Sequence, residues 1–405
     1  MKIPVFILVV LGLVMQCEQN DLSPSEDAAF SASEVSSLQK TSAELYSRLW
    51  EEMPDDNFVI SPLSIQLALY MAWNGADTDT RKEIGALLHT ALDENASQEL
   101  TKNIHSYFHH LFEEGSLGIF NSLFYDDDRI KLRKEYYHII QKYFEGDVVD
   151  LDFSSGEAVS IINEWASEKT AGRIGEIIDD ISPEELLFLI NALYLKADWD
   201  HPFPPETTTD RTFYLENGEE IEIPTMARTG LVEKLDDPGL KMIRLPLADT
   251  TLYMYFFRPS DEVPLSHLQV SELFDRLWND KPGFTSQRVM LSLPVFETRT
   301  HMELNASLKK LGMTTAFDPQ NADFSKIGSA TTGRPLFISR SLHDAYLRVD
   351  EKGVEGAAVT TLGIGTTSAP PAIRFDRPFV YMIADKNFHL PLFIGQFTGI
   401  EPENP

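Results

Sequence analysis

Between Val349 and Ala358 the chain reads VDEKGVEGAA, and from Gly356 to Ile373 it reads GAAVTTLGIGTTSAPPAI. The second stretch has no charged side chain, although 24% of the residues in the chain are charged. A core strand usually contains less Gly and Ala than this, and a solvated loop contains more charge. The composition is therefore typical of a segment that is a loop in one state and a buried strand in another.

Further blocks of sequence accompany this stretch. They are NFVISPLS at 57–64, NALYLKADW at 191–199 followed by Pro202-Phe203, LGM at 311–313, ADFS at 322–325, DRPF at 376–379 and FIG at 393–395. Together with Val349–Ala358 they strongly resemble the serpins, serine-protease inhibitors with a mobile reactive-centre loop. The blocks follow the family order over nearly the whole chain after residue 37. The resemblance implies the serpin fold, with a large antiparallel or mixed central sheet, further sheets and about eight to nine helices.

The hydrophobic pattern by itself predicts an α+β domain, with helices in the first third and strands mostly later. Ser61 can cap a helix through its hydroxyl, and Pro62 suits the first turn of that helix. Further helices are predicted at 45–50, 98–112, 131–144, 157–170 (with Ile161, Ile162 and Trp165 inward) and 304–311, the last stopped by Gly312. Strands are predicted at 186–195, which reads as buried on both faces, and at 251–257, 289–295, 379–383 and 392–397.

Residues 1–17 are predicted to be an export signal outside the fold. Lys2 precedes an apolar run from Val5 to Met15, which is too short to span a bilayer. Cys17, the single cysteine, closes the run and excludes an intrachain disulfide. It looks like the acylated cysteine of a bacterial lipoprotein, although Gln16 is bulky for that position. An ordinary cleaved signal is the alternative, and both interpretations predict an exported protein.

A flexible tether is predicted to follow the signal at residues 18–36, which are rich in Ser, Asp, Glu and Ala. No other linker of this composition precedes the C-terminus. We therefore expect a single domain at 37–405.

The charge balance restricts the partners. Asp and Glu outnumber Lys and Arg by 63 to 34, for a formal net charge of −29. Binding to nucleic acid needs clustered Lys and Arg, so the composition argues against a broad surface of that kind. Heparin-activated serpins have a basic helix near the position of residues 98–112. In this chain that stretch contains a single Lys or Arg, Lys102, with Glu99, Glu113 and Glu114 nearby. Heparin is not an expected partner, and a membrane is expected only through a lipid on Cys17.

Catalytic motifs are absent from the sequence: there is no GxSxG, HExxH, Walker or GxGxxG pattern. His105, His109 and His110 share a predicted helix without a third metal ligand nearby, so we expect solvated surface histidines, no metal and no cofactor. His343 and Asp344 are neighbours in a strand, where side chains point to opposite faces. We therefore expect a structural, buried His343 and a protein that is not an enzyme.

The resemblance also predicts the bond that a target protease attacks. In inhibitory serpins the hinge glutamate is the seventeenth residue before that bond, and counting from Glu351 places Thr367 before it and Ser368 after it. Pro370-Pro371 follows at the family's spacing. The predicted reactive bond is Thr367–Ser368 in a reactive-centre loop at about 351–371, with Ile364–Gly365 and Thr366–Thr367 as alternatives.

By the same resemblance, the hinge comprises Glu351, Gly353, Val354, Glu355, Gly356, Ala357 and Ala358. Its small residues suit rapid insertion between two strands. Val354 stands where the family usually has Thr or Ser, and its β-branched side chain still suits a strand. We expect the hinge to begin mostly exposed, so that Val354→Arg leaves the native fold nearly as stable while it slows insertion.

Other residues match positions that the family places across its central strands. Ser61, Ser64, Asn191 and His343 match the shutter, and Trp199 matches the breach tryptophan. The resemblance implies hydrogen bonds across strands that must part. Ordinary buried hydrogen bonding, with a helix cap at Ser61, is the alternative.

The resemblance implies an extracellular suicide-type inhibitor that traps a serine protease, or a papain-like cysteine protease, in a covalent 1:1 complex. No Lys or Arg lies between Lys352 and Arg374, so trypsin-like enzymes are not the expected targets. Thr366-Thr367 suits the shallow pocket of elastase-like or subtilisin-like proteases. The alternative is a non-inhibitory serpin that acts as a carrier, store or scaffold.

Overall fold

The computed structural model describes residues 30–113, 117–248, 251–260, 263–280, 283–354 and 370–399. These residues form an α+β structure, as the sequence predicts. The α-helices are α1 (Ala32–Glu52), α2 (Pro62–Gly75), α3 (Thr78–Leu87), α4 (Glu94–Glu113), α5 (Lys134–Tyr143), α6 (Ala158–Lys169), α7 (Val270–Asp275) and α8 (Asn305–Lys310). The strands are β1 (Phe58–Ile60), β2 (Leu117–Tyr125), β3 (Ile130–Leu132), β4 (Asp147–Asp150), β5 (Leu187–Leu195), β6 (Ala197–Asp198), β7 (Thr209–Tyr214), β8 (Glu220–Asp236), β9 (Leu240–Pro246), β10 (Leu252–Pro259), β11 (Thr285–Pro294), β12 (Phe296–Glu303), β13 (Gly328–Ala330), β14 (Leu342–Val349), β15 (Gly353–Val354), β16 (Ala372–Arg374), β17 (Phe379–Asp385) and β18 (Pro391–Phe397).

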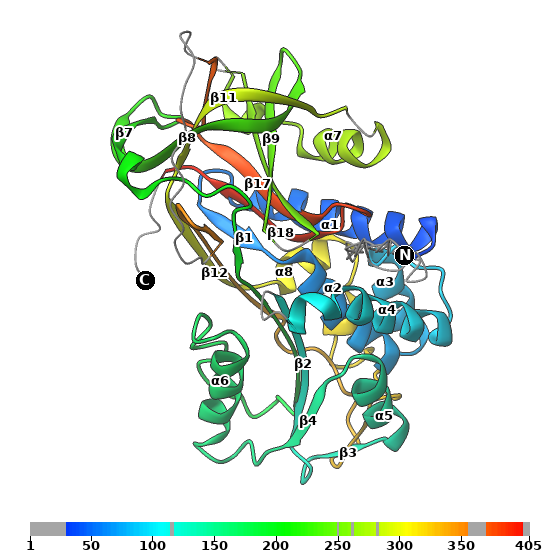
Figure 1. Cartoon of the computed structure of the whole chain (residues 1–405). Helices are drawn as coiled ribbons and strands as arrows, with labels where there is room; N and C mark the ends of the chain where they lie inside the picture. Colours follow the sequence, from blue (N-terminus) through cyan, green and yellow to red (C-terminus); the bar gives the residue numbers. More distant parts are fainter. Residues whose placement is uncertain are drawn as a thin grey trace, which may run out of the picture.

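A nine-stranded sheet occupies the upper part of the molecule in Figure 1. Its strands follow the order β1–β18–β17–β10–β9–β8–β11–β16, with β7 paired to β8. The ladder between β11 and β16 is parallel and the other ladders of this sheet are antiparallel. The short strand β16 therefore ends the sheet where the chain returns after residue 369.

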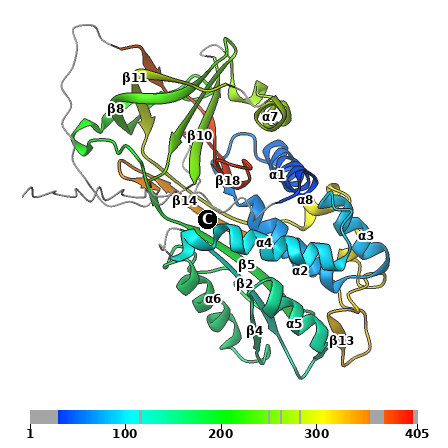
Figure 2. The ribbon, with the colours of Figure 1, turned by 45° about the vertical axis from the view of Figure 1, so that its right-hand side comes forward.

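The central sheet has a four-stranded part, in the order β12–β14–β15–β6, and a three-stranded part, in the order β4–β2–β5. β6 continues β5 after Lys196, so the chain connects the two parts directly. Among the described strands, no ladder joins β5 to β14. In Figure 2, β5, β2 and β4 run down the lower half of the molecule, with α6 and α5 beside them.

Helix α2 lies at the centre of the fold because its sequence is apolar around the whole circumference. The side-chain oxygen of Ser61 accepts the N–H of Ser64 at 3.2 Å, and Pro62 occupies the first turn. This cap confirms the predicted helix start. Only Ala68 of the helix is not fully buried, as expected of a helix enclosed by other elements.

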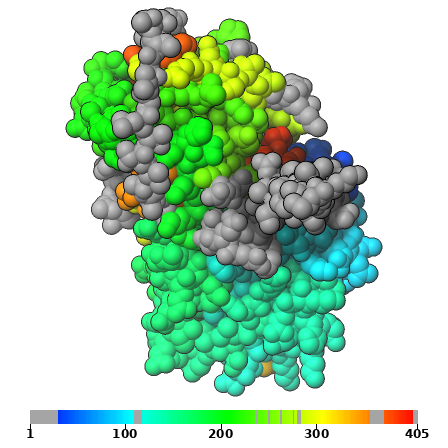
Figure 3. Space-filling view, in the orientation of Figure 1, coloured from blue at the N-terminus to red at the C-terminus, as the bar shows by residue number. Residues whose placement is uncertain are grey.

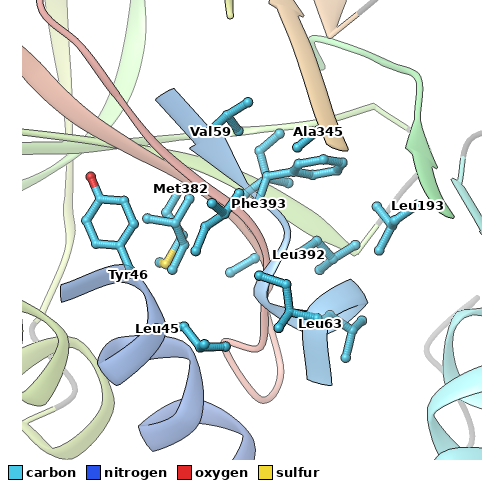
Figure 4. Close-up of a cluster of buried hydrophobic side chains, with 14 of the residues drawn as sticks. Leu45, Tyr46, Val59, Leu63, Leu193, Ala345, Met382, Leu392 and Phe393 are labelled. Carbon is cyan, nitrogen blue, oxygen red and sulfur yellow. The ribbon is translucent and has the colours of Figure 1, made fainter. Parts of the chain in front are cut away.

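The main core joins the two sheet systems. Figure 4 shows Leu45 and Tyr46 of α1 facing Met382, Leu392 and Phe393 of the nine-stranded sheet. In the same figure Leu63, Leu193 and Ala345 extend this cluster to α2, β5 and β14. A second cluster lies between α6 and the outer face of β2 and β5, where Ile162 and Ala166 pack near Phe124 and Phe188.

Four local predictions are wrong in detail. The flexible tether predicted at residues 18–36 extends too far, because residues 32–36 already belong to helix α1, which Ser31 caps. Ile161 is exposed on the outer side of α6, while Ile162 is buried. The predicted helix at 131–144 begins only at Lys134, because residues 130–132 pair with β13 as strand β3. In β5 alternate residues are only half-buried, among them Leu187 and Leu189, because they line a cavity described below.

Candidate functional site: the hinge and the cavity between β5 and β14

The hinge begins with a tight turn between β14 and β15. The N–H of Asp350 donates to the carbonyl of Gly353 at 3.0 Å, and the N–H of Lys352 donates to Oδ1 of Asp350 at 2.9 Å. The turn places Val354 opposite Val349, the last residue of β14. The chain therefore re-enters the central sheet directly after leaving it.

The first two hinge residues after this turn lie between two strands. Gly353 pairs with Asp198 and Val354 pairs with Ala197, so β15 bridges β14 and β6. A Cβ on Gly353 would lie 2.2 Å from the carbonyl oxygen of Ala197, a distance that only glycine avoids without movement of β6. Val354 is 0% exposed. The expectation that the hinge begins mostly exposed is wrong at this residue, because the turn at Asp350 feeds it into the sheet.

Trp199 holds the turn from the β6 side. Its indole Nε1 donates to the carbonyl of Asp350 at 2.9 Å, and its main-chain N–H donates to the carbonyl of Lys352 at 2.7 Å. The ring is buried and lies against Phe203 and Phe256. The residue that matches the breach tryptophan thus contacts the hinge directly.

Glu351 is anchored by two residues that the sequence analysis does not connect with it. The N–H of Phe203 donates to the carbonyl of Glu351 at 2.8 Å. The hydroxyl of Thr208 donates to the Glu351 carboxylate at 2.6 Å. Thr208 lies in a region without a helix or strand pattern, so its role depends on the tertiary fold alone.

A cavity of about 770 Å³ lies beyond the hinge, at the end of β5 that is far from β6. One wall is the apolar face of α2, with Ile65, Ala68, Leu69 and Ala72. The opposite sides are formed by residues 186–191, at the start of β5, and by residues 334–343, which lead into β14. The two strands that border the cavity have no ladder between them in the described part of the chain.

The predicted shutter residues lie along this cavity. The N–H of Ser61 donates to Nε2 of His343 at 3.1 Å, and the hydroxyl of Ser64 lies 3.4 Å from the carbonyl of Asn191. Ser64, Asn191 and His343 all line the cavity. The start of α2 is thus linked to both bordering strands by single hydrogen bonds.

A polar chain continues from Asn191 into the interior. Its side-chain N–H donates to Oδ1 of Asn121 at 2.7 Å, and Asn121 contacts Nε2 of His105 at 3.1 Å. His105 is 2% exposed, so the prediction of a solvated surface histidine is wrong for this residue. The signal that sequence analysis missed is Asn121, a polar residue inside an apolar strand, which needs a buried partner. The side chains of His109 and His110 lie outside the described residues.

His343 is buried, as predicted. It is 4% exposed, and burial lowers its pKa from 6.5 to about 4, so the ring is neutral at pH 7. The next residue, Asp344, pairs instead with His301, with 2.6 Å between its Oδ2 and Nδ1 of that ring. The two neighbours therefore do not form a dyad with one another.

Other predicted positions lie outside the described residues. These are Cys17, Glu355, Gly356, Ala357, Ala358, Thr367 and Ser368. Within the described residues, no group of three or more His, Cys, Asp or Glu side chains is arranged to hold a metal ion. No helix in the described ranges is long and apolar enough to cross a membrane.

Comparisons with known proteins agree with this architecture. The family model described as "Serpin (serine protease inhibitor)" matches residues 36–400. The rat alpha-1-antiproteinase is 27% identical, with 95% of this chain and 93% of the relative aligned. The rabbit (Oryctolagus cuniculus) corticosteroid-binding globulin is 29% identical over 87% of this chain and 92% of its own length. The crystal structure of the thermophilic serpin tengpin in its native state has a TM-score of 0.81 at 28% identity, covering 92% and 95% of the two chains.

These relatives include both an antiproteinase and a hormone-binding globulin, so similarity alone does not separate inhibitors from carriers. The family is nevertheless established, because the family model spans most of the chain and the fold agrees with that of a solved member. The chain belongs to the serpin family.

Proposed function

We propose that this serpin is an extracellular suicide-type inhibitor of serine endopeptidases that traps its target by inserting the reactive-centre loop into the central sheet. One observation carries the proposal: the sheet is joined by the hinge at β15 and has no ladder between β5 and β14 beyond it, where the 770 Å³ cavity lies. A strand that continued from Val354 would enter between these two strands.

The chemistry around the cavity supports a strand as its occupant. The described edges of β5 and β14 that border it have no partner strand, and an added strand would pair with both. The Oδ1 atom of Asn191 is buried without a hydrogen-bond partner among the described residues. A main-chain N–H from an inserted strand would satisfy such a group, whose isolation otherwise destabilises the fold.

The length and composition of the loop also fit. Residues 355–369 lie between Val354 and Pro370 and carry one charged side chain, Glu355. After cleavage at Thr367–Ser368 the segment that stays attached is residues 355–367, and thirteen residues at roughly 3.3 Å each extend about 43 Å, which would carry an attached protease along the sheet. Small residues at 356–358 would follow Val354 into the sheet first.

The covalent step uses the chemistry of the target protease. The hydroxyl oxygen of the protease's serine attacks the carbonyl carbon of Thr367, and the bond to the nitrogen of Ser368 breaks. The serine proton passes through the protease's general base to the new amino group of Ser368. An ester then joins Thr367 to the protease, and insertion must distort the protease before water hydrolyses that ester.

The target class and location extend the proposal. Thr367 favours proteases with shallow specificity pockets, either elastase-like or subtilisin-like, and a papain-like cysteine protease would form the corresponding thioester. In α4, Lys102 lies 3.8 Å from Glu99, which leaves little positive charge for heparin.

If a lipid on Cys17 anchors the protein, Cys17→Ala releases it from membranes into the soluble exported fraction. An unchanged distribution, with the mature N-terminus mapped elsewhere, supports plain secretion.

A carrier function is the second candidate because the corticosteroid-binding globulin is among the relatives. The deciding experiment incubates the purified protein with elastase and subtilisin and resolves the products on a denaturing gel. An inhibitor gives a band at the summed mass of protein and protease, with cleavage mapped to Thr367–Ser368. Clean cleavage without such a band, across the protease panel, contradicts the inhibitor proposal. Thr367→Arg should redirect complex formation toward trypsin.

A further inference from the structure

The outer face of the ribbon formed by β8 and β11 has unusually exposed apolar side chains. Leu231 is 61% exposed and Met290 is 37% exposed. Arg288 lies opposite Leu231 in the antiparallel ladder, and Thr229 lies opposite Met290. Directly opposed residues share a face of a sheet, so Leu231 and Met290 are diagonal neighbours on one side.

Arginines surround these two apolar side chains. The ladder with β16 places Arg374 beside Ser292, which is two residues after Met290 on the same face. Arg288 and Arg374 are exposed, and neither has an ion-pair partner among the described residues. Arg211 reaches the same face, where its guanidinium donates to the hydroxyl of Ser292 at 3.1 Å.

The positive charge of Arg288 is not neutralised by Glu233, the carboxylate on β8 that is nearest to Leu231 in sequence. Glu233 lies two residues from Leu231, and its carboxylate is ion-paired with Arg244. Arg288 therefore keeps its charge available to solvent or to a partner. The chain as a whole carries a formal net charge of −29. Around the exposed Leu231 and Met290, by contrast, two arginines without ion-pair partners among the described residues make the surface locally positive.

The position of this face relates it to the reactive-centre loop. The N–H of Met290 donates to the carbonyl of Pro371 at 2.9 Å, so the face begins where the loop returns to the fold. In Figure 3 the yellow surface of β11 and the orange surface near β16 lie together at the top of the molecule. Pro371 is three residues after Ser368, which is at most about 10 Å of extended chain.

We propose that Leu231, Arg288, Met290 and Arg374 form a secondary docking site for the target protease, and that this protease carries acidic side chains beside its active-site cleft. The inference rests on the proposed function, because it assumes that a protease approaches Thr367–Ser368. An apolar centre with an arginine rim is typical of protein interfaces. The rim attracts and orients an acidic protease that the rest of this acidic chain repels.

The experiment uses one subtilisin in two forms, the parent enzyme and a form whose exposed lysines beside the cleft are replaced by glutamate. The association rate constant with the intact serpin is measured for each form at low and high ionic strength. We expect the acidic form to react about tenfold faster at low salt and the difference to shrink at high salt. The double variant Arg288→Glu/Arg374→Glu should abolish this preference without changing the melting temperature.

A matched control changes the same amount of charge at the other end of the molecule. Lys131 in β3 and Lys134 at the start of α5 are exposed, and these two elements lie in the lower part of Figure 1. Lys131→Glu/Lys134→Glu should keep the preference for the acidic protease. An equal loss in both double variants, or no preference in the wild type, overturns the docking site.

A second measurement separates this inference from the proposed function. Each subtilisin form, inactivated by replacement of its catalytic serine with alanine, binds without forming an ester, so its affinity reports docking alone. Leu231→Ser should weaken binding of the acidic inactive form about three- to tenfold. Unchanged binding in Leu231→Ser and in the arginine double variant contradicts the docking site, even if covalent trapping succeeds. Weakened binding supports the docking site, even if covalent trapping fails.

Discussion

The main-chain N–H of Ser61 donates to Nε2 of His343 at 3.1 Å, which ties the start of α2 to β14 beside the cavity. The bond requires a neutral acceptor nitrogen, because a protonated imidazole has no lone pair at either nitrogen. Protonation of His343 would therefore remove this link between the start of α2 and β14, a strand that would have to move in the proposed insertion.

Acid should destabilise the protein through this histidine. Burial lowers the pKa of His343 from 6.5 to about 4, so the unfolded chain takes up a proton before the folded chain does. The contribution to the free energy of unfolding is unchanged above pH 6.5 and falls by about 3 kcal/mol between pH 6.5 and pH 4. His343→Gln keeps an acceptor but does not titrate, and should lose less stability over that interval. Chemical denaturation at pH 7 and pH 4.5 compares the two proteins, and identical losses would contradict the assignment.

The second prediction concerns Val354→Arg and replaces the expectation drawn from the sequence. Because Val354 is fully buried between β14 and β6, arginine at this position cannot keep its charge solvated within the sheet. We expect residues 353–354 to leave the sheet, with a loss of about 2 kcal/mol from the apolar contact of valine. Insertion should also slow, so the variant is cleaved and releases active protease. Thermal melting and the stoichiometry of inhibition measure the two effects.

Val354→Thr is the control for that variant, since threonine has a similar shape and suits a strand. It should retain the 1:1 covalent complex and most of the stability. Full inhibition by Val354→Arg would show that the hinge does not have to enter the sheet at this residue.

The close approach at Gly353 gives a third prediction. In Gly353→Ala the new methyl group would lie 2.2 Å from a main-chain oxygen and 2.5 Å from Cα of Asp198, so β6 or the hinge must move. Overpacking of this kind costs about 1–3 kcal/mol. Gly156→Ala is the matched control, because a Cβ there meets nothing within 4 Å. A lower melting temperature for Gly353→Ala alone supports the pairing of β15, whereas equal melting of the two variants argues against it.

The sequence predicted the parts of this site that depend on local pattern or on family resemblance. Ser61 and Pro62 predict the start of α2, and the apolar block around Asn191 predicts the strand that the structure shows as β5. The burial of Val354 could not be predicted, because it depends on whether β15 pairs with β6, which is 155 residues away. The bond between Thr208 and Glu351 depends on the same long-range pairing. His105 was misassigned because its partner Asn121 comes from another element.

The last prediction concerns the stability that the proposed loop insertion would add to the fold. In the described part of the chain, no ladder joins β5 to β14 beyond the hinge. The central sheet therefore lacks the hydrogen bonds and side-chain packing that a further strand between them would supply. Cutting the loop at Thr367–Ser368 frees residues 355–367 to fill that gap. The cleaved protein should therefore melt at a temperature higher by about 10 °C or more, since each new main-chain bond contributes roughly 0.5–1.5 kcal/mol.

Melting curves before and after limited proteolysis test this gain, with mass mapping of the cut. Val354→Arg serves as the internal comparison, because a charge at the first inserting residue opposes the same rearrangement. Its cleaved form should melt close to its intact form. A cleaved wild type without a stability gain would mean that the gap between β5 and β14 does not accept the loop, and loop insertion would then fail as the mechanism of this chain.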